Sequence, residues 1–253
     1  MIKIVFIYGL IIGSFLNVCI YRIPIQKNIA FPSSYCPKCN VHIRWYDNIP
    51  ILSYLILLGQ CRYCGDRISL QYPIIELLNA IIYSVLYYKF QFSLDFLFFS
   101  IISSILIIIS FIDLKYMIIP DVLVSIIFIS TIIHKILSHS MYNESINFLN
   151  GLAGFIISGV LFLAIVILSK GGMGGGDVTL ISTLGFILGI KLILLNIFLS
   201  FLLGACISVI LLSLKMKTKK DPIPFGPFII LSFFIVLLYG NNILSWYYNK
   251  FIL

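Results

Sequence analysis

Long runs of apolar residues, separated by short polar connections, constrain the fold of this chain more than any other feature. Eight such runs occur, and about 20 apolar residues in a helix suffice to cross a hydrocarbon core of about 30 Å. Their approximate ranges are 2–20, 72–90, 94–112, 121–138, 148–169, 178–190, 192–214 and 224–240. The sixth run is short, and only Lys191 and the pair Gly185 and Gly189 mark a break between it and the seventh. We therefore expect an all-α integral membrane protein with about eight transmembrane helices.

The composition supports the same class of protein. Of the 253 residues, 61% are hydrophobic and 10% are charged, and the mean hydropathy of +1.12 argues against a water-soluble domain of this size. The net charge is +8, but the 17 lysines and arginines are scattered through the connections and do not form one basic face. We therefore expect a lipid bilayer, and not nucleic acid, around this chain.

The distribution of positive charge predicts an orientation. Assigning successive connections to alternate sides places twelve lysines and arginines on one side and five on the other, which together are the 17 of the chain. Cytosolic connections of membrane proteins are enriched in lysine and arginine. The richer side is therefore expected to face the cytosol, with both termini on the opposite side.

One connection is long enough to form a separate segment. Residues 21–71 have the composition of a soluble segment and lie on the predicted cytosolic side. We expect three parts: a first transmembrane helix at 1–20, a cytosolic segment at 21–71, and a transmembrane domain at 72–253.

Four cysteines in this segment form two C-x-x-C pairs, Cys36 with Cys39 and Cys61 with Cys64. Two such pairs can bring four thiolates into a tetrahedron, which suits a structural Zn²⁺ with no open coordination position. A redox dithiol is the competing interpretation, although such motifs usually occur singly on a thioredoxin-like unit. A disulfide framework is disfavoured in the reducing cytosol.

Three aspartates lie at the predicted cytosolic ends of helices: Asp113, Asp121 and Asp177. Two carboxyl groups from separate helices that share a proton can activate a water for peptide hydrolysis, one as base and the other as acid. Asp121 follows a proline at a helix start, where the helix dipole favours a carboxylate, so we interpret it as structural. Asp177 could likewise be a helix cap. Asp113 ends its helix, where the dipole is unfavourable, although Lys115 could neutralise it.

A glycine-rich stretch, "GGMGGGD", precedes Asp177. Its glycines would let a substrate backbone approach Asp177 and would permit positive φ. They are Gly171, Gly172, Gly174, Gly175 and Gly176, of which the last three are the expected substrate loop. A phosphate-binding loop is the alternative, but no Walker-type lysine with a serine or threonine follows.

Four motifs in this order resemble the type IV prepilin peptidases, a family of GxGD membrane aspartyl proteases. They are "GSFLNVCIYRIP" at 13–24, the two C-x-x-C pairs, "DLKYMIIPD" and "GGMGGGD". The resemblance places the two catalytic aspartates at Asp113 and Asp177. The chain departs from the family pattern at Thr179, where a lysine is usual.

The resemblance implies a bacterial cytoplasmic-membrane enzyme that removes the basic leader from type IV prepilin or pseudopilin precursors on the cytosolic side. It also implies N-methylation of the new N-terminus with S-adenosylmethionine, for which the sequence indicates no binding residues. Asp47 and Asp66, which lie near the cysteine pairs in the sequence, could meet the charges of such a leader, but we favour ordinary solvated surface roles for both. Two alternatives stay open: a cation-coupled transporter that uses Asp113 and Asp177, and a zinc-bearing scaffold without activity.

Overall fold

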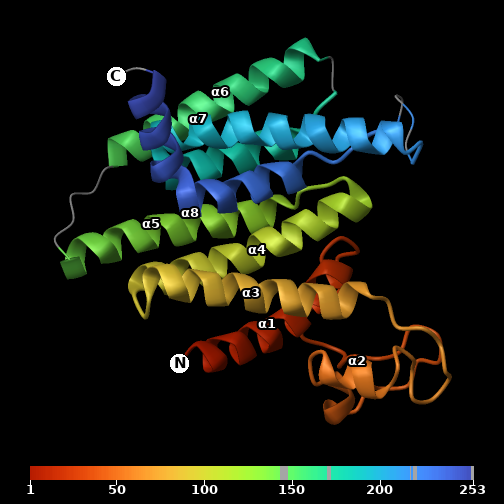
Figure 1. Cartoon of the computed structure of the whole chain (residues 1–253). Coiled ribbons are helices and arrows are strands. Elements are labelled where there is room, and N and C mark those ends of the chain that lie inside the picture. The colour runs from red at the N-terminus through yellow and green to blue at the C-terminus, as the bar shows by residue number, and fades with distance from the viewer. Residues whose placement is uncertain (143–147, 170–171, 217, 219–220, 252–253) are drawn as a thin grey trace. The chain divides into compact units, whose positions relative to one another are not determined.

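The computed structural model describes residues 1–142, 148–169, 172–216, 218 and 221–251. Its long helices, shown in Figure 1, are α1 (Ile2–Arg22), α3 (Gln71–Phe90), α4 (Leu94–Tyr116), α5 (Asp121–Tyr142), α6 (Phe148–Leu168), α7 (Gly175–Ser213) and α8 (Gly226–Phe251). A 3₁₀ turn η1 (Trp45–Asn48) and the short helix α2 (Leu52–Ile56) lie between α1 and α3. No strand occurs in the described ranges. The predicted all-α class is confirmed.

Each predicted apolar run lies in a helix. Six helices of the described chain are long and apolar enough to cross a membrane: α1, α4, α5, α6, α7 and α8. α3 is not among these six. The sixth and seventh predicted runs both lie in α7, so the expected eight segments correspond to seven long helices in the described residues.

The chain forms two compact units, Met1–Ile108 and Ile109–Leu253. In the first unit, α1 and α3 lie side by side and antiparallel (Figure 1), with Gly9 against Ala80 and Gly13 against Glu76. A Cβ at Gly9 or Gly13 would lie 2.5 or 2.6 Å from the partner's backbone, so only glycine permits this approach. Asn79 strengthens the pair by donating a hydrogen bond to the Gly9 carbonyl at 2.8 Å. Small residues and buried amides are the means by which helices associate in lipid.

In the second unit, α6 packs closely on α7. Gly154 and Gly185 face each other so tightly that a Cβ on either would lie 2.4 to 2.5 Å from the other's carbonyl oxygen. Ser158 of α6 also donates a hydrogen bond to the Ile181 carbonyl at 3.2 Å. The contact therefore depends on backbone approach and on interhelical hydrogen bonding, as is common within membranes.

α7 reverses its direction at Gly189. Ser182 lies beside Gly159 of α6, and Phe201 contacts Phe162 only one turn further along α6. A straight helix would separate residues 182 and 201 by about 28 Å, so the two halves of α7 fold back on each other. Gly189 has φ 73° and ψ 177°, a conformation that essentially only glycine adopts. The break lies at Gly189, one of the three residues that the sequence marked for it.

Asn150 of α6 stabilises this reversal. Its side-chain oxygen accepts a hydrogen bond from the amide of Ile190 at 3.1 Å, which satisfies a donor at the start of the second half of α7. The same side chain lies where a Cβ at Gly189 would be, at 2.4 Å.

We predict that Gly189→Ala destabilises the protein by about 1 to 3 kcal/mol, because alanine is strained in this conformation and its Cβ would displace Asn150. The midpoint of thermal unfolding in detergent should fall. Leu194→Ala, which truncates a half-exposed side chain on the same helix, is the control and should have a smaller effect. Equal midpoints for Gly189→Ala and the parent protein would contradict this account of the reversal.

Candidate functional site

Asp113 lies in the last turn of α4 and is 5% exposed. Its Oδ2 accepts a hydrogen bond from the backbone amide of Gly226 at 3.0 Å. Gly226 is the first residue of α8. The C-terminus of α4 disfavours a negative charge, but the N-terminus of α8 favours one. The unfavourable dipole expected from the sequence is therefore offset by a second helix.

Glycine is required at position 226 by this contact. A Cβ there would lie 2.6 Å from Asp113 Oδ2, which is shorter than real Cβ contacts. The carboxylate can thus reach the first turn of α8 only because residue 226 has no side chain.

Asp177 is the third residue of α7 and is 7% exposed. Its Oδ2 accepts a hydrogen bond from the amide of Gly174 at 3.3 Å, so it closes the start of the helix as a capping residue. Its Oδ1 is buried and has no hydrogen-bond partner in the described part of the chain. The cap interpretation of Asp177 is therefore compatible with a second role, because capping uses only one of the two oxygens.

The two aspartates lie near each other in the second unit. Ile119 lies against a neighbour of each aspartate: a Cβ at Gly176, directly before Asp177, would lie 2.8 Å from Ile119 Cβ, and one at Gly226, whose amide binds Asp113, would lie 3.4 Å from Ile119 Cδ1. The structure thus brings together the two carboxyl groups that the sequence singled out.

The glycines before Asp177 begin helix α7 and do not use the positive φ that glycine permits. Gly174 is the N-cap of α7 with φ −75°, and Gly175 and Gly176 lie in its first turn. None of the described glycines of the stretch has positive φ, and Gly171 lies outside the described residues. Glycine at 176 is explained by the close contact with Ile119, and a Cβ at Gly175 would meet nothing within 4 Å.

Two other residues considered from the sequence have structural surroundings. Asp121 begins α5 and is exposed, as expected for a carboxylate at a helix start. Thr179, at the position where a lysine is usual, donates a hydrogen bond to the Gly176 carbonyl at 3.0 Å and is exposed.

The four cysteines of the first unit form one cluster. Their Sγ atoms all lie within 4.8 Å of one another, and those of Cys36 and Cys64 are 3.8 Å apart. Four thiolates around a metal at about 2.3 Å in a tetrahedron would be about 3.8 Å apart. The cluster therefore fits a tetrahedral metal ion with four sulfur ligands.

The two cysteine pairs adopt the same backbone turn, which the sequence analysis missed. The amide of Asn40 donates to the Cys36 carbonyl at 2.8 Å, and the amide of Gly65 donates to the Cys61 carbonyl at 2.9 Å. Asn40 and Gly65 have φ 57° and 68°. Each directly follows the second cysteine of its pair, and glycine and asparagine are the residues that adopt this conformation most readily. The available signal was the pattern C-x-x-C-[Asn or Gly].

The amide of Cys39 lowers the pKa of the Cys36 thiol to about 7 through a hydrogen bond. The pKa of Cys64 is raised to about 12, so without a metal the four thiols share their protons unequally.

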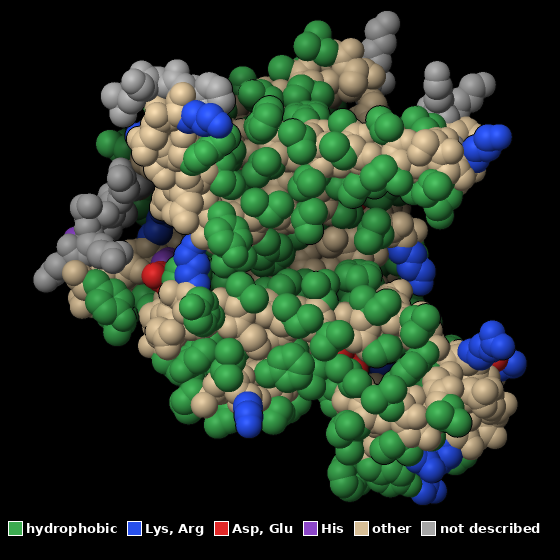
Figure 2. Space-filling view, viewed as in Figure 1, with side chains coloured by type: hydrophobic (Ala, Val, Ile, Leu, Met, Phe, Trp, Pro, Cys, Tyr) green, Lys and Arg blue, Asp and Glu red, His purple; other side chains and the backbone are tan. Residues whose placement is uncertain are grey.

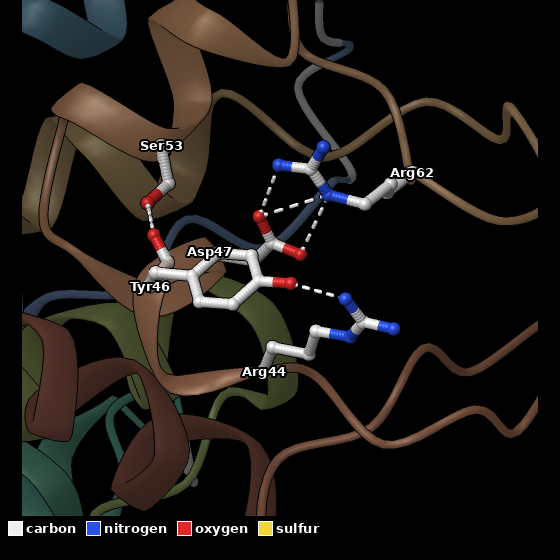
Figure 3. A network of polar contacts seen from close by, with 5 residues as sticks. All are labelled: Arg44, Tyr46, Asp47, Ser53 and Arg62. Carbon is white, nitrogen blue, oxygen red and sulfur yellow. Dashed lines mark hydrogen bonds and ion pairs between the residues drawn. The ribbon is translucent and has the colours of Figure 1, made fainter.

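A polar network next to the cysteines holds η1 against α2 (Figure 3). Arg62 binds Asp47 through two nitrogens, Nη2 to Oδ1 at 2.6 Å and Nε to Oδ2 at 2.9 Å. Ser53 donates to the Tyr46 carbonyl at 2.8 Å, and Arg44 donates to the Tyr46 hydroxyl. The hydrogen bond from Arg62 lowers the pKa of Asp47. The side chain of Asp47 is therefore engaged inside the segment.

Asp66 is engaged in a similar way, because Lys38 lies 2.8 Å from its Oδ1. This ion pair joins the first cysteine turn to the second. Both acidic residues of the segment thus bind basic residues of the same segment, as their expected surface roles allow.

Comparisons with known proteins match nearly the whole chain. Residues 7–90 match the bacterial peptidase A24 N-terminal domain, and residues 100–209 match the type IV leader peptidase family. A prepilin leader peptidase/N-methyltransferase of Bacillus subtilis is 36% identical over 98% of both chains. The chain belongs to the type IV leader peptidase family. Proteins with the same name from Aeromonas salmonicida and Pseudomonas aeruginosa are 33% and 31% identical over 97% and 94% of this chain, and over 93% and 90% of their own.

No solved structure matches the chain. The resemblance drawn from the four motifs is confirmed by the sequence comparisons. Membership of this family also favours a peptidase over the cation transporter that the same two aspartates could have served.

We predict that this leader peptidase family member binds one metal ion per chain through the four cysteines. Cys36→Ser should lose most of the bound metal after dialysis, because one of four thiolates is removed. Cys206→Ser is the matched control, since Cys206 is an exposed cysteine on α7 outside the cluster. Metal content measured by atomic emission checks the prediction. A full complement of metal in Cys36→Ser would contradict it.

Proposed function

We propose that this protein is a membrane aspartyl endopeptidase that removes the basic leader peptide from type IV prepilin or pseudopilin precursors. The observation that carries the proposal is the pair of buried carboxyl groups, Asp113 and Asp177. Each has one oxygen held by a backbone amide at a helix N-terminus, and Asp177 Oδ1 has no partner in the described residues. Buried ionisable groups at membrane depth are expensive and usually functional.

In the proposed mechanism, a water molecule lies between the two carboxyl groups, one ionised and the other protonated. The ionised carboxylate takes a proton from the water as its oxygen attacks the scissile carbonyl carbon, and the protonated group donates to the carbonyl oxygen. Collapse of the tetrahedral intermediate breaks the C–N bond. The departing amine takes up a proton, which leaves a carboxyl group on the leader and a free amine on the mature protein.

The backbone around Asp177 suits a peptide substrate. The space next to Gly175 is open, since a Cβ there would meet nothing within 4 Å. An extended substrate backbone can therefore approach the free oxygen of Asp177 without meeting a side chain at this residue. This supports Gly174, Gly175 and Gly176 as the substrate loop.

The proposed site faces the cytosol of a bacterium, across its cytoplasmic membrane. Twelve of the 17 lysines and arginines belong to the connections on this side. The apolar helix of the precursor would lie among the membrane helices, with its basic leader in the cytosol. We assign the peptidase domain to residues 72–253, with the first helix at 1–20 and the cysteine segment at 21–71.

The metal in the four-cysteine cluster is proposed to be Zn²⁺. Four thiolates complete its tetrahedral coordination, so the ion would stabilise the segment and not take part in the reaction. In a segment with so little core of its own, metal binding would supply much of the folding free energy.

A second proposed activity is methylation of the new N-terminal amine by S-adenosylmethionine. The relatives carry N-methyltransferase in their names, which supports this proposal. The amine nitrogen would attack the donor's methyl carbon, the carbon–sulfur bond would break, and the amine would lose a proton. The chain has no glycine-rich nucleotide fingerprint of the Rossmann type in residues 21–71, so we assign no binding residues to the donor.

We predict that Asp113→Asn and Asp177→Asn each lower leader cleavage by roughly 10² to 10⁴-fold, the contribution typical of a positioned acid or base. Cleavage of a model prepilin in membrane vesicles measures this effect. Asn is nearly the same size as Asp, so insertion and folding should be retained. Asp121→Asn is the matched control, because Asp121 also begins a helix but is exposed, and it should cleave normally.

Normal cleavage by Asp113→Asn or Asp177→Asn would remove that residue from the catalytic pair. Loss of cleavage in Asp121→Asn, with equal amounts of protein in the membrane, would also contradict the assignment.

We also predict that the two Asn variants still methylate a peptide that already begins at the mature N-terminus. Methyl transfer needs a free amine and the donor, whereas the carboxyl pair serves only hydrolysis. Mass spectrometry of the peptide after incubation with S-adenosylmethionine measures the added methyl group. If both variants lose methylation of the pre-cut peptide while retaining their fold, the two activities share these aspartates.

A further inference from the structure

The short helix α2 has its apolar side chains on the outside. Ser53 is buried and donates its hydrogen bond inward to Tyr46. Three apolar residues of α2 are exposed: Leu52, Leu55 and Ile56 are 57%, 61% and 74% exposed. Leu58, just after the helix, is 85% exposed. Leu52, Leu55 and Ile56 are spaced at i, i+3 and i+4, so they share one helix face. This arrangement is the reverse of a helix in a water-soluble protein, and we call these four residues the α2 apolar face.

The start of α2 is held against the helix pair α1 and α3. The amide of Ile51, directly before α2, donates a hydrogen bond to Glu76 Oε2 at 2.8 Å. Glu76 itself packs on Gly13 of α1. Gly13 lies nine residues before the end of α1 at Arg22, a distance of about 13 Å along the helix.

The side chain of Glu76 leans toward the N-terminus of α3, which lies at the Arg22 end of α1 because the two helices are antiparallel. Ile51 is therefore somewhat nearer that end than Gly13, but still within the length of α1. Its φ of 60° is rare for a β-branched residue, so the chain is drawn in to this position by surrounding contacts. Interfacial helices bury their apolar faces about 5 to 10 Å into the boundary between headgroups and acyl chains, and α2 begins beside α1, a helix long and apolar enough to cross a membrane.

The segment around α2 carries net positive charge. Between residues 21 and 71 there are six lysines and arginines and two aspartates. Both aspartates are paired with basic residues, Asp47 with Arg62 and Asp66 with Lys38. Three exposed basic residues of the segment are left without an aspartate partner in it: Lys27, Arg44 and Arg67. Figure 2 shows hydrophobic side chains gathered on this part of the protein, with lysine and arginine at its edges. Such charges are attracted to anionic lipid headgroups.

An exposed tryptophan next to α2 also favours a position at the membrane surface. Trp45 of η1 is 81% exposed. Tryptophan is among the residues most enriched at the membrane–water interface, so this exposed ring suits a position there. Its neighbour Arg44 lies over the rings of Tyr46 and Tyr63, at 5.8 and 5.9 Å. Aromatic rings with arginines beside them are suited to the headgroup layer.

We propose that the α2 apolar face inserts into the interface of the surrounding bilayer and that the basic residues of the segment bind anionic phospholipid headgroups. The four-cysteine segment is then a membrane-surface element, held both by the lipid and by the Ile51–Glu76 hydrogen bond. The proposal does not depend on the peptidase assignment. A precursor's apolar helix or a second copy of the chain could also cover an apolar face, but the basic surroundings and the attachment beside α1 favour lipid.

A single tryptophan on the α2 apolar face tests the proposal. The chain has two tryptophans, so Trp45→Phe and Trp246→Phe remove the background and Ile56→Trp adds the probe. The full-length protein is reconstituted in vesicles of phosphatidylcholine with or without phosphatidylglycerol, using acyl chains that are brominated near the headgroup or not brominated. We expect blue-shifted emission, strong quenching by the brominated lipid, and weak quenching by acrylamide in water.

Two further variants sharpen the result. Adding Leu52→Ser and Leu55→Ser should reverse both quenching effects while one metal ion per chain is retained, which shows that the segment stays folded. Adding Arg44→Gln and Arg67→Gln should reduce the extra quenching that phosphatidylglycerol produces. Quenching of the probe by acrylamide and not by brominated lipid would overturn the proposal. Protection that appears only with a prepilin peptide, or only at high protein concentration in detergent, would overturn it in favour of a protein partner.

Discussion

The candidate site depends on two backbone amides at helix N-termini. The amide of Gly226 at the start of α8 holds Asp113, and the amide of Gly174 at the start of α7 holds Asp177. Each amide reduces the cost of placing a carboxyl group in a buried position, because helix N-termini favour negative charge. Each also binds only one oxygen, so the carboxyl groups are oriented but not fully satisfied. This is a physical route by which a membrane protein can hold two acidic groups close together.

Several features of the second unit serve to bring these two helix starts together. α7 and α8 can begin near Asp113 only because Gly226 and Gly176 lack side chains that would collide with Asp113 and Ile119. α7 returns along α6 because Gly189 adopts a conformation closed to other residues. The close contact of Gly154 with Gly185 fixes the first half of α7 against α6. Glycines therefore determine the site geometry more directly than the apolar packing does.

Much of this could be predicted from the sequence, because its signals are local. Apolar runs predicted the helices, the C-x-x-C spacing predicted the cysteine cluster, and the costly positions of Asp113 and Asp177 singled them out. The partners of those residues could not be predicted. Gly226 lies 113 residues from Asp113, and nothing in a single sequence links a glycine after a proline-rich connection to that carboxylate. The described glycines of the stretch before Asp177 do not use the positive φ that glycine permits; Gly176 instead lies close to Ile119, and the space beside Gly175 is open.

The central claim is that Asp113 and Asp177 act as one catalytic unit, and a double-substitution comparison tests it most directly. Leader cleavage would be measured under single-turnover conditions for Asp113→Asn, Asp177→Asn and the protein carrying both changes. Residues that act as a unit show strongly non-additive effects. The account predicts that the double variant is no slower than the slower single variant. Losses that multiply would show that the two carboxyl groups contribute independently, which would contradict the shared site described above.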